Sequence, residues 1–362
     1  MVKKWSFVTM LLVVVVLVAA CAAPAAAPAA GGEAGAAVEA APGSEPASSV
    51  DEPATPSGEP FRIAIVMPSS TEDIAWSQSM FTALKAVQSE MGGESALEIA
   101  VSENMFQVAD AAAAIRDYAA DGNDLVIAHG TQYGNSMFEV AKDFPETSFA
   151  WGTATDTGES EGFTNVFAYE AKAQEGGYVN GVIAAMLSQA NIIGVVGPVE
   201  AGDAKLYIDG FVAGVKATKP DAEVNISYTG SFGDTALAAE AANTHIKAGA
   251  DVLTGSAQQV VGAIGVAADN KVFWLGTQAD QTPLAPDYVV TNQLYDWVGV
   301  VKDMIALHNS GTLGGKVYTL TLADGLEMQL SDNPALTDEI RTAADAAIAG
   351  IKNGSIDPMP SE

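Results

Sequence analysis

The chain has 362 residues, with 16 Lys and Arg against 45 Asp and Glu, and its formal net charge at pH 7 is −29. A chain this acidic lacks the basic groups that displace counterions from phosphates, which argues against nucleic-acid binding. An anionic bilayer would also repel it, so we expect any membrane contact to be made through a lipid alone.

The first 20 residues predict a secretion signal. Two lysines precede an apolar run at about 7–18, and two alanines follow it. The run is shorter than the roughly 20 residues that a permanent membrane-spanning helix needs.

The residue after the two alanines, Cys21, is the single cysteine of the chain. The order Val-Ala-Ala-Cys resembles a bacterial lipobox, in which Cys21 becomes the lipidated first residue; the alternative is an ordinary signal peptide with a cysteine there by chance.

Residues 21–60 predict a disordered tether. They consist mainly of Ala, Pro, Gly and Ser, with six acids and no Lys or Arg. A segment without aromatic residues or apolar periodicity buries too little surface to offset the entropy lost on ordering. We therefore expect an extended link between the membrane surface and a folded domain.

From residue 61 onward the pattern alternates between apolar runs of strand length and helical runs, which predicts parallel strands buried on both faces. About 300 residues remain, enough for two domains. The fold class expected is α/β, with two doubly wound parallel-sheet lobes. The predicted strands lie at 61–68, 97–104, 124–130, 148–154, 165–170, 191–198, 223–234, 251–256 and 271–277, and predicted helices lie at 108–120, 135–144, 175–189, 210–220 and 238–249.

The last third predicts how the lobes connect. Residues 287–311 indicate a strand followed by a helix, 316–330 a hairpin-like pair, and 334–354 an amphipathic helix. If the chain crosses near 165–170, 292 and 323, three strands form a hinge, with a cleft at the carboxyl ends of both sheets. The predicted lobes are then 61–168 with 293–322, and 169–292 with 323–362.

Six segments together resemble the basic membrane protein family of ABC-transporter substrate-binding lipoproteins, which is related to purine nucleoside receptors. The resemblance implies a bilobal periplasmic-binding-protein type I fold, a purine-like ligand, and an ABC permease and ATPase as partners. It also implies a monomer anchored outside the cytoplasm. The segments are DIAWSQSMFTALKA (73–86), HGTQYGNSMFEVAKDFPETSF (129–149), NVFAYEAKAQEGGYVNGVIA (165–184), GFVAGVKATKPDAEV (210–224), YTGSFGD (228–234) and GTQADQTPLAP (276–286).

A purine presents two flat faces and a polar edge, so its site needs aromatic side chains for stacking and fixed polar groups in the ring plane. Candidates follow the predicted strand ends. The predicted ligand-binding residues are Asp73, Trp76, Tyr133, Phe232, Gln278, Asp280 and Trp297. Each has an ordinary alternative: the aromatic residues can pack in the core, Trp297 can anchor the helix that starts there, and Asp73 and Asp234 suit helix N-caps.

The chain departs from the family pattern in its start, where Asp73-Ile74-Ala75-Trp76 replaces Asp-Gly-Gly-Trp, and at two later positions. Nucleoside receptors of the family commonly have GVDSDQ and a later lysine, where this chain has Gln278 for the first acid and Tyr295 for the lysine. A second branch, which resembles binders of adenine and other purine bases, has a tryptophan in the turn that holds Trp297. Both a purine base and a nucleoside remain open as ligands.

The sequence gives little support to an enzyme. It contains no GxSxG, HExxH or GxxxxGK[ST] motif, and His129, His245 and His308 are far apart along the chain. We expect no cofactor and no metal. Of the three histidines, only His129 lies at a predicted strand end, where it can hydrogen-bond a ligand.

Two other functional classes compete with the importer receptor. One is a receptor for a sugar or signalling molecule that serves a membrane sensor, and the last is an enzyme such as a nucleoside hydrolase.

Overall fold

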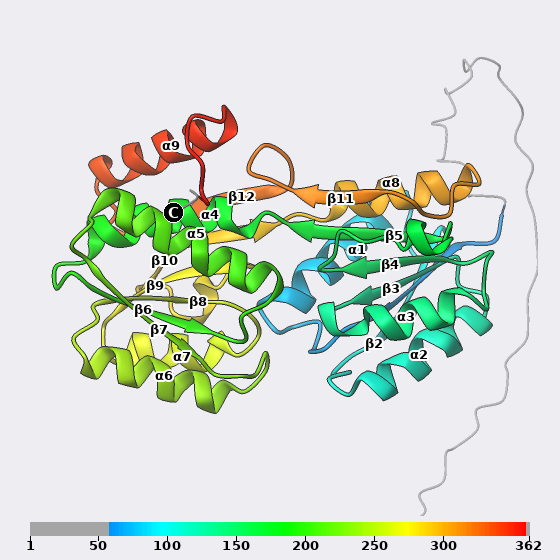
Figure 1. The fold of residues 1–362 in the computed structure, drawn as a ribbon, viewed down its shortest axis with the longest axis horizontal. Helices are drawn as coiled ribbons and strands as arrows, with labels where there is room; N and C mark the ends of the chain where they lie inside the picture. Colours follow the sequence, from blue (N-terminus) through cyan, green and yellow to red (C-terminus); the bar gives the residue numbers. More distant parts are fainter. Residues whose placement is uncertain (1–57, 360–362) are drawn as a thin grey trace, which may run out of the picture. The chain divides into compact units, whose positions relative to one another are not determined.

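The structure is a computed structural model that describes residues 58–359. The predicted signal, Cys21 and nearly all of the predicted tether lie outside these residues. The described residues form two parallel-sheet α/β lobes within one compact unit, which confirms the predicted fold class (Figure 1). Within 58–359, no helix combines the length and the apolar character needed to cross a bilayer.

The first lobe is built on a sheet in which every neighbouring pair of strands is parallel. Its strand order is β11 (Val317–Leu320), β5 (Val166–Ala171), β4 (Ser148–Gly152), β3 (Leu125–His129), β1 (Phe61–Val66) and β2 (Leu97–Ser102). Its helices are α1 (Trp76–Met91), α2 (Val108–Ala120), α3 (Gly134–Ala141) and α8 (Val298–Asn309), with short 3-10 turns η1 (Thr131–Tyr133) and η2 (Glu159–Glu161). Every residue of β3 is buried, because helices cover both faces of the sheet.

The second lobe repeats this plan with one antiparallel strand at its edge. Its strand order is β12 (Leu326–Leu330), β10 (Val289–Tyr295), β9 (Phe273–Gln278), β8 (Val252–Gly255), β6 (Ile192–Gly197) and β7 (Glu223–Tyr228). Its helices are α4 (Ala173–Leu187), α5 (Gly202–Thr218), α6 (Thr235–Lys247), α7 (Val260–Asp269) and α9 (Asp338–Lys352), with a 3-10 turn η3 (Thr282–Leu284). Helices α6 and α7 cover one face, and α4 and α5 cover the other.

Three short connections join the lobes: β5 leads to α4, β10 leads to α8, and β11 leads to β12. The predicted boundaries at 168/169 and 292/293 fall inside β5 and β10, each of which belongs to one sheet along its whole length. The predicted hairpin-like pair at 316–330 is wrong. Its two strands lie in different sheets, because β11 pairs with β5 and β12 pairs with β10.

Helices α4 and α5 pack backbone to backbone through glycines. A Cβ atom added to Gly177 would meet the carbonyl oxygen of Tyr207, and one added to Gly181 would meet that of Phe211. From the other side, a Cβ atom on Gly214 would meet the carbonyl of Tyr178. Since residues four apart share one helix face, the glycines form a flat stripe that lets the two helix axes approach closely.

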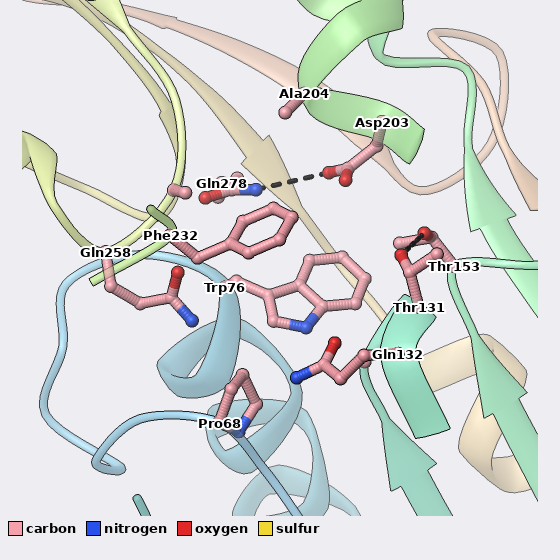
Figure 2. Close-up of a pocket in the computed structure, with 12 residues that line it drawn as sticks. Pro68, Trp76, Thr131, Gln132, Thr153, Asp203, Ala204, Phe232, Gln258 and Gln278 are labelled. Carbon is pink, nitrogen blue, oxygen red and sulfur yellow. Dashed lines mark hydrogen bonds between the residues drawn. The ribbon is translucent and has the colours of Figure 1, made fainter. Parts of the chain in front are cut away.

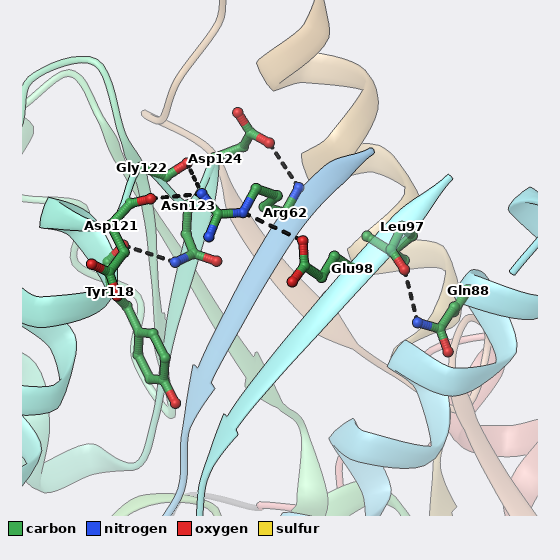
Figure 3. A network of polar contacts seen from close by, with 9 residues as sticks. All are labelled: Arg62, Gln88, Leu97, Glu98, Tyr118, Asp121, Gly122, Asn123 and Asp124. Atoms are coloured by element: carbon green, nitrogen blue, oxygen red, sulfur yellow. Dashed lines mark hydrogen bonds and ion pairs between the residues drawn. The ribbon is translucent and has the colours of Figure 1, made fainter. Parts of the chain in front are cut away.

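Arg62 fixes the amino end of β1 to its neighbours (Figure 3). Its guanidinium Nη1 donates to the carbonyl oxygens of Asp121 and Gly122, at 2.6 and 3.1 Å, and its Nε lies 3.5 Å from Glu98 Oε2. The backbone N–H of Arg62 donates to Asp124 Oδ2 at 2.7 Å. The network lies at the amino ends of the strands, so the opposite ends remain available for a site.

Candidate functional site

A cavity lies where the carboxyl ends of seven strands meet, which is where ligands bind in open α/β sheets (Figure 2). It encloses about 370 Å³ of space, counting the part open to solvent. The space therefore suits a small or flat molecule. The first lobe contributes Pro68, Trp76, Gly130, Thr131, Gln132 and Thr153, and the second contributes Asp203, Ala204, Phe232, Ala257, Gln258 and Gln278.

Trp76 presents one indole face to the cavity. Its other face stacks on the His129 ring, with centroids 4.1 Å apart and planes 2° from parallel. Tyr295 and Trp297 meet it edge to face, with centroids at 6.3 and 5.9 Å. Because the side chain is only 5% exposed and is packed on these sides, the face that lines the cavity is its remaining free surface.

His129 holds Trp76 in place, and both of its ring nitrogens are hydrogen-bonded within the protein. Trp76 Nε1 donates to the His129 carbonyl at 3.1 Å, and His129 Nε2 lies 3.0 Å from the Trp76 carbonyl, so Nε2 is the protonated nitrogen. Nδ1 then accepts from the Tyr169 hydroxyl at 2.7 Å. Burial lowers the pKa of His129 to about 3, so the ring is neutral at physiological pH. His129 thus supports the stacking surface and does not line the cavity.

The neutral His129 predicts an acid-sensitive stability. A depressed histidine pKa contributes stability that is complete above the unfolded value of 6.5 and is lost as the pH falls toward 3. We expect the difference in free energy of unfolding between the parent and His129→Gln to shrink over this range, by up to about 1.4 kcal/mol per pH unit. Urea unfolding at several pH values measures it. A difference that does not change with pH would contradict a buried neutral histidine.

Phe232 approaches the cavity from the loop between β7 and α6 (Figure 2). Polar contacts shape this loop: Gln259 N donates to the Phe232 carbonyl at 2.9 Å, and Asp234 caps α6 by accepting from Ala236 N and Leu237 N. The Phe232 ring itself is half-buried and belongs to none of the hydrophobic clusters found within 58–359. The fold therefore does not need the ring for its core, which leaves it free to contact a ligand.

Asp203 is a buried carboxyl group in the first turn of α5. Its Oδ2 accepts from Gln278 Nε2 and from the Tyr295 hydroxyl, each at 3.1 Å. The Gln278 amide nitrogen must face the carboxylate, so its oxygen points elsewhere. That oxygen, Oε1, is buried and has no hydrogen-bond partner. The pair therefore offers a carboxylate and an unpaired amide oxygen, both acceptors, on residues that line the cavity.

Because the Asp203 carboxyl group is buried, we expect the protein to become more stable when its negative charge is removed. Burial raises its pKa, against the hydrogen bonds from Gln278 and Tyr295, so the stability it contributes is full below the unfolded value of 3.8 and is lost as the pH rises through the folded value. We expect Asp203→Asn to raise the melting temperature of the ligand-free protein at pH 7 by about 2–4 °C. The gain should shrink toward pH 4. A lower melting temperature at pH 7 would show that the ionised carboxylate is net stabilising.

Backbone strain gathers around the same cavity. Ile74, Ala257 and Gln278 have φ angles of 52°, 70° and 76°, in the left-handed region that side chains with a Cβ seldom adopt. Ala257 and Gln278 line the cavity, and Ile74 lies two residues before Trp76. Strained residues are found preferentially at ligand sites, where the surrounding structure holds them.

Three of the seven residues predicted as ligand contacts line the cavity: Trp76, Phe232 and Gln278. The other four lie behind or beside the lining. The Asp73 carboxylate caps α1 by accepting from the backbone N–H groups of Ala75, Ser77 and Gln78.

The remaining three also make internal contacts. Tyr133 is buried and donates to the Met105 carbonyl at 2.8 Å. Trp297 is buried and its Nε1 donates to Ser79 Oγ at 3.1 Å. Asp280 is exposed and accepts from Thr282 N and from Asn292 Nδ2.

The sequence did not predict Asp203, although it follows strand β6 as the other candidates follow theirs. Also missed were Thr131 and Thr153, whose hydroxyl groups lie 2.6 Å apart, and the amides of Gln132 and Gln258. Within 58–359, no cluster of three or more His, Cys, Asp or Glu side chains is placed to hold a metal ion.

Comparison with known proteins decides the family. The profile of the PnrA-like ABC transporter substrate-binding proteins, Bmp, matches residues 61–355. The chain belongs to this family. The family consists of substrate-binding proteins of ABC transporters, which bind small molecules outside the cytoplasm.

Individual relatives agree with this membership. A purine-binding protein of Brucella abortus is 28% identical over 301 residues, which cover 83% of each chain. A putative ABC transporter glucose-binding protein of Haloferax volcanii is 24% identical and covers 83% of this chain and 74% of its own. A solute-binding protein of an ABC transporter system from Aeropyrum pernix superposes with a TM-score of 0.70 at 18% identity, covering 84% of this chain and 94% of that one. This likeness shows a type I periplasmic-binding-protein fold.

Proposed function

We propose that the chain is a lipid-anchored receptor of an ABC importer that binds a purine base or nucleoside in the cavity between its lobes. In this proposal Cys21 carries the lipid, residues 21–60 form the tether, and the loaded receptor docks on a permease and its ATPase as a monomer. The observation that carries the proposed ligand is the free face of Trp76, which lines the same narrow cavity as the Phe232 ring.

The shape and chemistry of the cavity favour a flat, nitrogen-rich ring. Two aromatic side chains from different lobes suit the faces of such a ring. Asp203 and Gln278 supply acceptors for its edge, and the amides of Gln132 and Gln258 supply further polar groups. The Brucella relative described as purine-binding supports the same ligand class.

Hinge closure is the mechanism that we propose. Ligand contacts from both lobes favour the closed form in proportion to the difference in affinity between the two forms. Two contacts already join the lobes beside the cavity. Gln281 Nε2 donates to the Ile74 carbonyl at 3.4 Å, and the Phe106 ring lies so close to Gly233 that a Cβ atom there would be 2.6 Å from it.

Thermal unfolding of residues 55–362, refolded to remove carried ligand, tests the proposal. The panel contains purine bases, nucleosides, pyrimidines, pentoses and hexoses. A ligand that binds only the folded state raises the melting temperature as its concentration exceeds its dissociation constant. We expect a rise with purine bases or their nucleosides. A rise with sugars alone would favour the second candidate, a sugar receptor such as the Haloferax relative is described to be, and would overturn the purine assignment.

A further inference from the structure

The polar end of the cavity is rich in acceptors. Gln278 is 3% exposed, and its Oε1 has no hydrogen-bond partner in the described structure. Its amide cannot be turned around to change this, because the nitrogen end already donates to Asp203 Oδ2 at 3.1 Å and an oxygen there would face a carboxylate. A buried polar atom without a partner is rare, and because Gln278 lines the cavity, a donor on a bound ligand is a group that can supply the missing partner.

Asp203 adds a second acceptor beside the first. Its Oδ2 receives hydrogen bonds from Gln278 and Tyr295, but a carboxylate offers about four lone-pair sites, so it retains capacity for a further donor. Because Asp203 also lines the cavity, a ligand can reach it. The two acceptors belong to side chains that are hydrogen-bonded to each other, so they lie close together at one end of the cavity.

Asp203 is also the one charged side chain among the twelve residues that line the cavity. A ligand that carries a phosphate would bring a second negative charge against this carboxylate with no lining cation to compensate it. An oxygen attached to the ring at the same place would direct its lone pairs at two acceptors, the Asp203 carboxylate and Gln278 Oε1. An amino group attached to the ring instead supplies two N–H bonds that diverge in the ring plane.

We propose that Asp203 and Gln278 Oε1 together bind an exocyclic amino group, so that the ligand is an uncharged aminopurine and the site discriminates against 6-oxopurines without an amino group. This inference rests on the proposed function. One amino hydrogen is donated to the Asp203 carboxylate and the other to Gln278 Oε1. Trp76 and Phe232 contact the faces of the ring.

Calorimetric titration of residues 55–362 with adenine, guanine and hypoxanthine tests the inference. Adenine differs from hypoxanthine by an amino group in place of the oxygen at C6, and guanine differs by an added amino group at C2. We expect at least one aminopurine to bind at least about tenfold more tightly than hypoxanthine, because hypoxanthine leaves a buried acceptor unpaired. In Asp203→Asn this preference should fall below about threefold. Asp221→Asn, an exposed acid outside the cavity, should retain it.

The outcomes separate the two proposals. Hypoxanthine that binds as tightly as both aminopurines would overturn the inference and leave the purine receptor standing. A preference that survives unchanged in Asp203→Asn would also overturn it, because the carboxylate would then not be the group that binds the amine. If neither the three bases nor adenosine, guanosine and inosine bind, both proposals fail.

Discussion

Phe232→Ala is expected to weaken purine binding by about tenfold to a hundredfold while leaving the unfolding of the ligand-free protein almost unchanged. Stacking of a base on an aromatic side chain contributes about 1–3 kcal/mol, and tenfold in affinity corresponds to about 1.4 kcal/mol. Phe232 is half-buried and outside the hydrophobic clusters of residues 58–359, so the fold loses little when the ring is removed. Calorimetric titration with the purine that gives the largest thermal shift measures the affinity.

Leu237→Ala is the matched control. Leu237 lies in the first turn of α6, beyond the same loop, is 40% exposed and does not line the cavity. Its replacement should leave the affinity unchanged. Trp76→Ala is a less clean test, because Trp76 also belongs to the main hydrophobic core and its loss should cost about 3–5 kcal/mol of stability. Parent-like binding by Phe232→Ala would refute stacking on this ring.

The sequence predicted most strands well because burial on both faces leaves a strong local signal, but the strand predicted at 223–234 ends at Tyr228 and continues as a loop. A strand such as β3 has only buried residues, and the apolar run that predicts it is continuous. The prediction for 316–330 was wrong because two strands separated by five residues have the same local sequence pattern whether they pair with each other or join different sheets. Pairing with β5 and β10 is a long-range property that no local pattern contains.

The sequence predicts which loops lie near the cavity, but it does not predict which of their side chains point into it. Trp76 and Trp297 both follow strand ends, yet one lines the cavity and the other is buried behind it. Asp203 was missed for a related reason. The sequence predicts the helix from residue 210, whereas α5 begins at Gly202, so Asp203 falls in the stretch between predicted strand and helix, where an acid gives no sign of burial.

The departures at Gln278 and Tyr295 take on a different meaning in the folded chain. The sequence indicated the loss of an acid at one position and of a cation at the other. In the structure both residues donate to the same carboxylate, that of Asp203 in the first turn of α5, which follows strand β6. An acid is thus present at this place after all, and it is bound by neutral groups instead of a lysine.

Gly181→Ala and Gly214→Ala are each expected to lower the free energy of unfolding by about 1–3 kcal/mol. Alanine favours a helix over glycine by about 1 kcal/mol, so propensity alone predicts the opposite sign. Overpacking reverses it, because each added methyl group would overlap the backbone of the facing helix, which cannot move aside as a side chain can. Urea unfolding gives the values. Gly265→Ala in α7 is the control: nothing lies within 4 Å of its added Cβ, and it should gain about 0.5–1 kcal/mol.

The same substitutions should also weaken ligand binding. Helix α5 carries Asp203 in its first turn, and its contact with α4 fixes how far that turn stands from Gln278 and Tyr295. A methyl group at Gly214 pushes α5 away from α4, so the hydrogen bonds to Asp203 lengthen even though Gly214 lies far from the cavity along the helix. Gly214→Ala with parent-like affinity but reduced stability would show that the second sheet, and not the helix pair, positions the carboxylate.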